Sequence, residues 1–192
     1  MALRNLFDSF FQEEEVRTRP LVCGLAPKFA NLLESDAKIY SRFYSATTIK
    51  KSSTVGELLD SIDKRYDIVH VLCDVSSNRI ISAARGNTIT GTLLIEKCCS
   101  ADVKLLWIAS ENGAESYIKG FKAAGKRINL VMTISRNGPS FSGFLQKLLS
   151  KIAHGETMPK AWASLAPQAP GSAHRELPDC IFAAFRPDAK FR

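Results

Sequence analysis

Polar and nucleophilic side chains follow three apolar runs of the chain, at the points where buried strands are expected to end. The candidate binding residues in these places are Cys73, Asp74, Ser110, Glu111, Asn112, Gly113, Arg136 and Asn137. A thiol or hydroxyl becomes a catalytic nucleophile when a neighbouring loop presents a base to it. Glycine and Asn-Gly pairs form turns that direct backbone N–H groups at a ligand. These loops therefore have the composition of a nucleophilic or ligand-binding site.

His70 and Cys73 are a second candidate catalytic pair, three residues apart on one predicted strand. Side chains alternate between the two faces of a strand, so these two are expected to point to opposite faces. Packing in the core is therefore the expected role of His70. Cys73 is expected to act mainly as a small core residue. His154 lies near the expected end of a helix, where it would cap the helix.

The chain carries no motif for a cofactor or a metal. It lacks GxGxxG, GxxxxGK[ST] and GxSxG. The histidines are far apart, and the cysteines show no CxxC spacing (Cys23, Cys73, Cys98, Cys99 and Cys180). We therefore expect neither a zinc site nor a cofactor. An odd number of thiols among apolar residues is typical of a reduced, cytoplasmic protein.

The candidate residues must be positioned by the elements that the hydrophobic pattern predicts. Helices are predicted over 3–16, from residue 30 for a short stretch, and over 55–64, 88–99, 115–124, 141–154 and 158–165. Strands are predicted over 21–25, 39–44, 66–74, 79–81 as a short edge strand, 103–109, 128–134 and 181–185. Residues 167–178 are rich in Pro, Gly and Ser and predict a loop. Within these elements, Thr54 with Glu57 fits a capping box, and Leu93 is expected to face inward.

Strands that alternate with helices favour right-handed parallel crossovers. The sequence therefore predicts an α/β fold, a three-layer αβα sandwich with a mostly parallel central sheet. In such folds, sites lie beyond the carboxyl ends of the strands. That rule selects residues 74–79, 110–113 and 135–140.

The chain of 192 residues is long enough for one domain with a small appendage. We expect an amphipathic N-terminal helix within residues 1–19 and an α/β domain over 20–192. The net charge is +7, but the basic residues are scattered, which argues against a nucleic-acid partner. No apolar run is long enough to cross a membrane, and the N-terminus lacks a signal sequence.

From about residue 40 onward, the chain resembles the CHAT domains, which are caspase-like cysteine peptidases. The resemblance lies in SAT at 45–47 with YDIVHV at 66–71, in VKLLWIASENG at 103–113, and in AGKRINLV at 124–131. It continues in FLQKLLSKIAHGETMPKA at 144–161 and in FAAF at 182–185. The resemblance implies a caspase-like fold and a catalytic His–Cys dyad on the first two strand-end loops.

At both dyad positions, the chain departs from that family. The family's first loop has His-Gly where this chain has Asp74-Val75, and its nucleophilic Cys is replaced by Ser110. A cysteine peptidase needs an imidazole that takes the thiol proton and later protonates the leaving amine. A carboxyl group is ionised at neutral pH and is a poor proton donor there. The changes predict a peptidase fold without peptidase activity.

The resemblance and its departures predict a catalytically inactive, caspase-like interaction or regulatory module, in bacterial signalling or defence. A protein or peptide is the expected partner, and the N-terminal helix is the expected docking element or homo-oligomer contact. One alternative is a divergent peptidase that uses Ser110 or Cys73. Another is a binder of a small anionic or nucleotide signal. Asp67, Asp74 and Glu111 are further candidates for a pocket that selects basic side chains.

Overall fold

Five parallel strands and one antiparallel strand form the central sheet of the computed structural model. The structure describes residues 17–76, 79–81, 88–110, 128–133, 140–165, 180–183 and 186–192. The sheet order is β2-β1-β3-β7-β8-β9, and only β9 runs antiparallel to its neighbour. The strands are β1 (Pro20–Leu25), β2 (Thr48–Ser52), β3 (Ile68–Leu72), β7 (Leu105–Ala109), β8 (Asn129–Thr133) and β9 (Cys180–Ala183).

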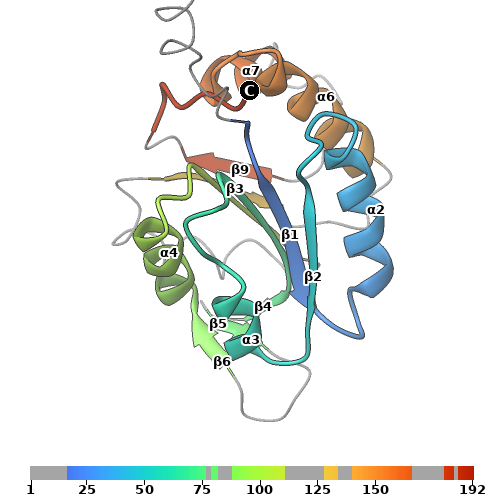
Figure 1. Cartoon of the computed structure of the whole chain (residues 1–192), viewed down its shortest axis with the longest axis vertical. Helices are drawn as coiled ribbons and strands as arrows, with labels where there is room; N and C mark the ends of the chain where they lie inside the picture. The colour runs from blue at the N-terminus through green and yellow to red at the C-terminus, as the bar shows by residue number, and fades with distance from the viewer. Residues whose placement is uncertain are drawn as a thin grey trace, which may run out of the picture.

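Helices cover both faces of this sheet. They are α2 (Ala30–Tyr40), α3 (Val55–Asp60), α4 (Gly91–Ser100), α6 (Phe141–Ala153) and α7 (Met158–Leu165). Figure 1 shows α4 on one side of the sheet and α2 on the other, with α6 beside α2. This arrangement confirms the predicted three-layer α/β sandwich with a mostly parallel sheet.

The central strands are buried because both of their faces are covered. Every residue of β3 and of β7 is buried, as their nearly continuous apolar sequences predict. Trp107 of β7 packs edge-to-face against Phe141 and Phe144 of α6, at ring-centroid distances of 5.9 and 6.3 Å. Phe144 in turn meets Trp162 of α7 at 5.4 Å, so both tryptophans lie in the core or at a helix interface, as expected.

A second, antiparallel sheet lies at the carboxyl end of the central strands (Figure 1). Its strands are β4 (Asp74–Ser76), β5 (Arg79–Ile81) and β6 (Thr88–Thr90), in the order β4-β5-β6. The prediction of a strand over 79–81 is confirmed, but its prediction as an edge strand is wrong. β5 is the middle strand of this small sheet, and periodicity over three residues cannot reveal how many neighbours a strand has.

Local capping agrees with the sequence at the ends of two helices. Thr54 accepts a hydrogen bond from the Glu57 N–H at 3.1 Å, which begins α3. Glu57 reaches back to the N–H of Ser53 at 2.8 Å, one residue before the cap. At the end of α6, His154 lies with Nδ1 2.6 Å from the Ser150 carbonyl oxygen, and Gly155 follows with a φ of 91°. The expected capping role of His154 is therefore confirmed.

The predicted strand over 39–44 is wrong, because α2 continues to Tyr40 and then closes in a turn. Leu33, Ala37 and Tyr40 recur at helical spacing and are all buried. Tyr44 N–H donates to the Tyr40 carbonyl, again in a helical pattern. Alternation over six residues was too short a signal to outweigh this longer apolar stripe.

Two further differences concern polar or partly exposed segments. β2 was not predicted, because Thr48–Ser52 is largely polar and is held as a strand by pairing with β1. Residues 88–90 form β6 before the helix begins at Gly91, where the Thr90 side chain accepts from the Leu93 N–H at 3.2 Å. Leu93 was expected to face inward but is 43% exposed, because Leu94 occupies the inward position.

The helices predicted over 3–16 and 115–124 and the loop over 167–178 lie outside the described residues. None of the helices in the described part of the chain is long and apolar enough to cross a membrane.

Candidate functional site

Adjacent strands bring the two predicted dyad positions to one edge of the sheet. β3 and β7 are parallel neighbours, with Leu72 opposite Ala109. Cys73 N–H donates to the Ala109 carbonyl at 3.2 Å, so the pairing continues one residue past β3. Asp74 and Ser110 therefore follow neighbouring strands at their carboxyl ends, where the topology of an α/β sheet places binding sites.

Asp74 is held by a lysine from the neighbouring strand end. The Nζ of Lys28 lies 2.8 and 2.7 Å from the two carboxylate oxygens of Asp74. Lys28 follows β1, just after the cis Ala26–Pro27 peptide bond, and its Nζ also lies 5.2 Å from the Phe29 ring centroid. The cation thus contacts both oxygens of the carboxylate. A carboxyl group that donates a proton would instead carry that proton on one of these oxygens.

Both candidate nucleophiles are buried. Ser110 and Cys73 are each 0% exposed. Burial raises the pKa of the Cys73 thiol well above its usual range, and the nearby Cys23 and Asp74 raise it further. Cys73 is therefore a neutral thiol, and a substrate carbonyl cannot reach either side chain in this conformation.

His70 lies on the other face of the sheet from Cys73. Its ring meets Tyr40 of α2 and Phe141 of α6 edge-on, at centroid distances of 5.5 and 6.4 Å. Cys23, which influences Cys73, instead interacts with Ser61 at the end of α3. The expectation that His70 and Cys73 point apart and that His70 packs in the core is confirmed.

Sequence analysis missed the polar partners of His70. Tyr40 Oη lies 3.2 Å from Nδ1 of His70, and Oδ2 of Asp36 lies 3.2 Å from its Nε2. Nε2 of His70 has no hydrogen-bond partner of good geometry in the described part of the chain. Asp36 and His70 are both 0% exposed. The sequence did contain one signal for Asp36. Its position falls among the inward-facing residues of α2, which indicates a buried carboxyl group.

Lys28 was missed as well, although the rule that selected the other loops would have found it. The loop after β1 reaches the same edge of the sheet as the loops after β3 and β7. Residues 26–28 directly follow the apolar run over 21–25, which makes them a strand end of the same kind.

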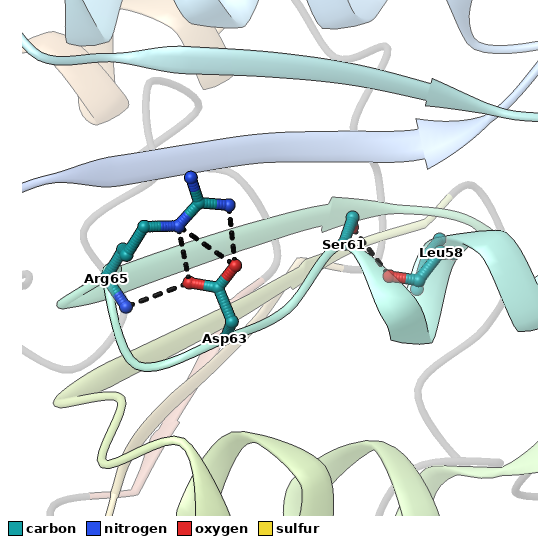
Figure 2. A network of polar contacts seen from close by, with 4 residues as sticks. All are labelled: Leu58, Ser61, Asp63 and Arg65. Carbon is teal, nitrogen blue, oxygen red and sulfur yellow. Dashed lines mark hydrogen bonds and ion pairs between the residues drawn. The ribbon is translucent and has the colours of Figure 1, made fainter.

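The connection between α3 and β3 is fixed by a compact polar network (Figure 2). Asp63 accepts from the backbone N–H of Arg65 at 2.9 Å and pairs with its guanidinium at 2.7 Å. The hydrogen bond from Arg65 holds the pKa of the Asp63 carboxyl below its usual value. Ser61 Oγ donates to the Leu58 carbonyl at 2.6 Å. These contacts shape the turn that leads into β3, and β3 in turn carries His70 and delivers Asp74.

Asp67 does not belong to this edge of the sheet, which corrects its place among the pocket candidates. It precedes β3, accepts from the Arg19 N–H at 3.1 Å and pairs with Lys104 at 2.7 Å. A five-residue strand spans about 17 Å, so Asp67 and Asp74 lie at opposite ends of the sheet.

The other candidates, Glu111, Asn112, Gly113, Arg136 and Asn137, lie outside the described residues. Within the described ranges, no group of three or more His, Cys, Asp or Glu side chains is arranged to hold a metal ion.

The structure is similar to the crystal structure of drICE, a caspase. The two share 13% sequence identity with a TM-score of 0.41, over 70% of this chain and 72% of the drICE chain. No protein-family model matches the chain, and a search of curated proteins finds no match. The proposals below rest on the motifs of the sequence and on the geometry of the described residues.

Proposed function

We propose that this chain is a catalytically inactive, caspase-like domain that acts as a protein-interaction or regulatory module. The sequence motifs supply the resemblance to the CHAT domains. The observation that carries the proposal is the state of the two dyad positions: the Asp74 carboxylate is paired with Lys28, and Ser110 is fully buried.

Peptide-bond cleavage needs groups that these positions do not offer. The attacking atom must reach the substrate carbonyl, and a nearby group must take its proton and then protonate the leaving amine. Ser110 has no exposed surface, and the described residues place no imidazole at this edge. His70 lies in the core against Asp36 and Tyr40.

The same burial argues against the alternative peptidase mechanisms. A nucleophilic Cys73 would require a thiolate, and burial opposes the ionisation of its thiol. A role in binding a small anion would need an available cation at this edge. Lys28 lies at this edge, and its charge is already paired with Asp74.

The rest of the proposal concerns the cellular role of the domain, its partner and its N-terminal segment. The resemblance supports a role in bacterial signalling or defence, with a protein or a peptide segment as the partner, and the free thiols favour the cytoplasm. The segment 1–19 would serve as a separate docking appendage or a contact between copies, with the α/β domain spanning 20–192.

Site-resolved chemical labelling tests the absence of catalysis. Native protein at neutral pH is treated with a cysteine-reactive peptide electrophile and, in a separate sample, with a fluorophosphonate. Modified sites are then mapped by mass spectrometry. We expect no labelling of Cys73 or Ser110 until the protein is denatured. Labelling of the partly exposed Cys99 serves as the control that the thiol reagent is active.

Two variants make this experiment decisive. Cys73→Ala and Ser110→Ala should leave the labelling pattern of the native protein unchanged. If either residue is labelled stoichiometrically in the folded protein, and the signal disappears in its alanine variant, then the domain carries a working nucleophile and the proposal is wrong.

A further inference from the structure

The outer edge of β2 has the features of a docking site for an extended peptide. β2 is the last strand in the order β2-β1-β3-β7-β8-β9 and pairs with β1 alone among the described strands. Its three central residues, Ile49, Lys50 and Lys51, are all exposed. Figure 1 shows β2 at the border of the sheet, running beside β1. An edge strand of this kind offers backbone groups that a further strand can pair with.

The register shows which backbone groups face outward. The Ser52 carbonyl accepts from the Ala26 N–H at 2.8 Å, so Ser52 directs its backbone groups toward the β1 side. In a parallel ladder, the N–H and C=O of one residue point to the same side, and successive residues alternate. Ile49 and Lys51 therefore direct their N–H and C=O groups away from β1. No other described residue bonds to these groups.

The side chains along this edge favour one kind of occupant. Ile49 is 43% exposed, which is unusual for a large apolar residue of this domain. Lys50 and Lys51 follow it directly, and Lys51 is paired at 2.6 Å with Glu34 of α2. Lys38, one helical turn after Glu34, is exposed as well. Glu34 balances only one of these cations. The edge is therefore apolar at one point and basic around it.

Charge also disfavours a second copy of this chain at the same edge. Two β2 strands placed side by side would bring their lysines together, and such like-charge pairing is a common protection against edge-to-edge association. An acidic strand would be attracted by the same lysines. We propose that the β2 edge binds an extended acidic peptide segment of a partner protein by strand addition, with Ile49 as its apolar contact.

This inference holds whether or not the ends of β3 and β7 are catalytic, because it uses a different part of the molecule. A failure here leaves the labelling experiment unaffected, and the reverse is also true.

Peptide binding to defined variants tests the proposal. The probe is a fluorescent seven-residue peptide with alternating Glu and Val, titrated by polarisation at low salt. The controls are a peptide with alternating Lys and Val, and a Glu-rich peptide with interspersed prolines that prevent strand pairing. We expect saturable binding of the first peptide, with binding at least about tenfold weaker for both controls.

The Ile49→Pro variant removes one outward N–H while leaving the ladder to β1 intact, since the Ile49 N–H does not point to β1. We expect this variant to bind the acidic peptide about tenfold more weakly, and Ile49→Val, which keeps the N–H and the apolar side chain, to bind it within a factor of about three. Lys50→Glu should weaken binding of the acidic peptide and strengthen binding of the Lys peptide. Circular dichroism and thermal melting check that each variant is folded.

Hydrogen exchange locates the bound peptide in the wild-type protein. We expect slower exchange at the amides of Ile49 and Lys51 when the acidic peptide is present, with Lys50 unchanged. The proposal is overturned if the proline-containing peptide binds equally well, if no acidic peptide binds, or if protection appears elsewhere. It is also overturned if sedimentation shows that β2 pairs two copies of the chain and that Ile49→Pro separates them.

Discussion

Three cysteines act in this structure as core side chains. Cys23, Cys73 and Cys98 are all 0% exposed. Burial raises the pKa of Cys23 to about 12, and this effect outweighs the lowering by its hydrogen bond with Ser61. Burial likewise raises the pKa values of Cys73 and Cys98, and the neighbouring Cys23 contributes to both. These thiols are neutral and unreactive in the folded protein.

Buried neutral thiols predict that stability falls in alkaline solution. In the unfolded chain they ionise near pH 9, whereas in the folded chain they remain protonated toward pH 12. The unfolded state therefore holds fewer protons in this window, and the free energy of unfolding decreases as the pH rises through it. Each thiol contributes a slope of up to about 1.4 kcal/mol per pH unit.

Urea denaturation under reducing conditions between pH 8 and pH 10.5 measures this slope. We expect Cys73→Ala to lose stability less steeply above pH 9 than the wild-type protein. Cys99→Ala, which removes a partly exposed thiol, should keep the wild-type slope. Equal slopes for all three proteins would show that the buried thiols do not drive the alkaline loss.

Two glycines illustrate how differently strands and helices tolerate an added methyl group. In the middle of β1, a Cβ on Gly24 would lie 2.7 Å from the Leu72 carbonyl oxygen and 3.2 Å from a Leu33 methyl group. On α6, a Cβ on Gly143 would meet no atom within 4 Å. β1 lies between β2 and β3 and under α2, so its backbone has no room to move.

These surroundings predict opposite effects for the same substitution. Gly24→Ala should destabilise the protein by about 1–3 kcal/mol, because a backbone carbonyl must shift. Gly143→Ala should stabilise it by about 0.5–1 kcal/mol, since alanine favours the helix over the unfolded chain. Chemical denaturation of the two variants provides the test, and a neutral Gly24→Ala would mean that β1 is less tightly enclosed than described.

Most of the central elements could be predicted, because they carry a local signal. β3 and β7 are apolar runs, β8 has an apolar centre, and α6 repeats apolar residues at helical spacing. β2 could not be predicted, because its polar sequence is a strand only through its pairing with β1. The end of α2 was misassigned because a short alternation of apolar residues fits either a strand or a helix.

The candidate site was predicted in outline only. The rule for parallel sheets correctly placed the positions after β3 and β7 at one edge. The same rule would also place Lys28 there, but it could not supply the pairing of Lys28 with Asp74, since those residues are 46 positions apart and no local pattern links them. The contact of Asp36 with His70 is likewise a product of tertiary packing, between a helix and a strand that are distant in sequence.

The two ends of the described chain contact each other at the amino-terminal edge of the sheet. Thr18 N–H donates to the Arg192 carbonyl at 2.7 Å, and the Tyr44 hydroxyl donates to the Phe191 carbonyl at 3.2 Å. The Phe191 side chain is 0% exposed. Phe191 is therefore a core residue, although the residues around it in 186–192 are exposed or partly exposed.

The buried position of Phe191 predicts that a substitution near the end of the sequence has a large effect on stability. Phe191→Ala should lower the free energy of unfolding by about 3–5 kcal/mol, because it empties a fully enclosed aromatic site. Lys190→Ala removes an exposed side chain that bonds the Gly155 carbonyl, and it should change stability by less than about 0.5 kcal/mol. Thermal and urea unfolding of these two variants measure the effect. If Phe191→Ala were as stable as Lys190→Ala, then Phe191 would not be a core residue.

The contact between Thr18 and Arg192 also determines how the domain would be tethered. Residues 1–16, and any sequence fused after residue 192, join the fold at this one place. Because the central strands are parallel, the Lys28–Asp74 pair lies at the far end of the sheet, about 17 Å of strand away. A domain attached at such a single point presents its opposite end outward, so fusions or surface immobilisation through either terminus leave the Lys28–Asp74 end of the sheet directed away from the attachment.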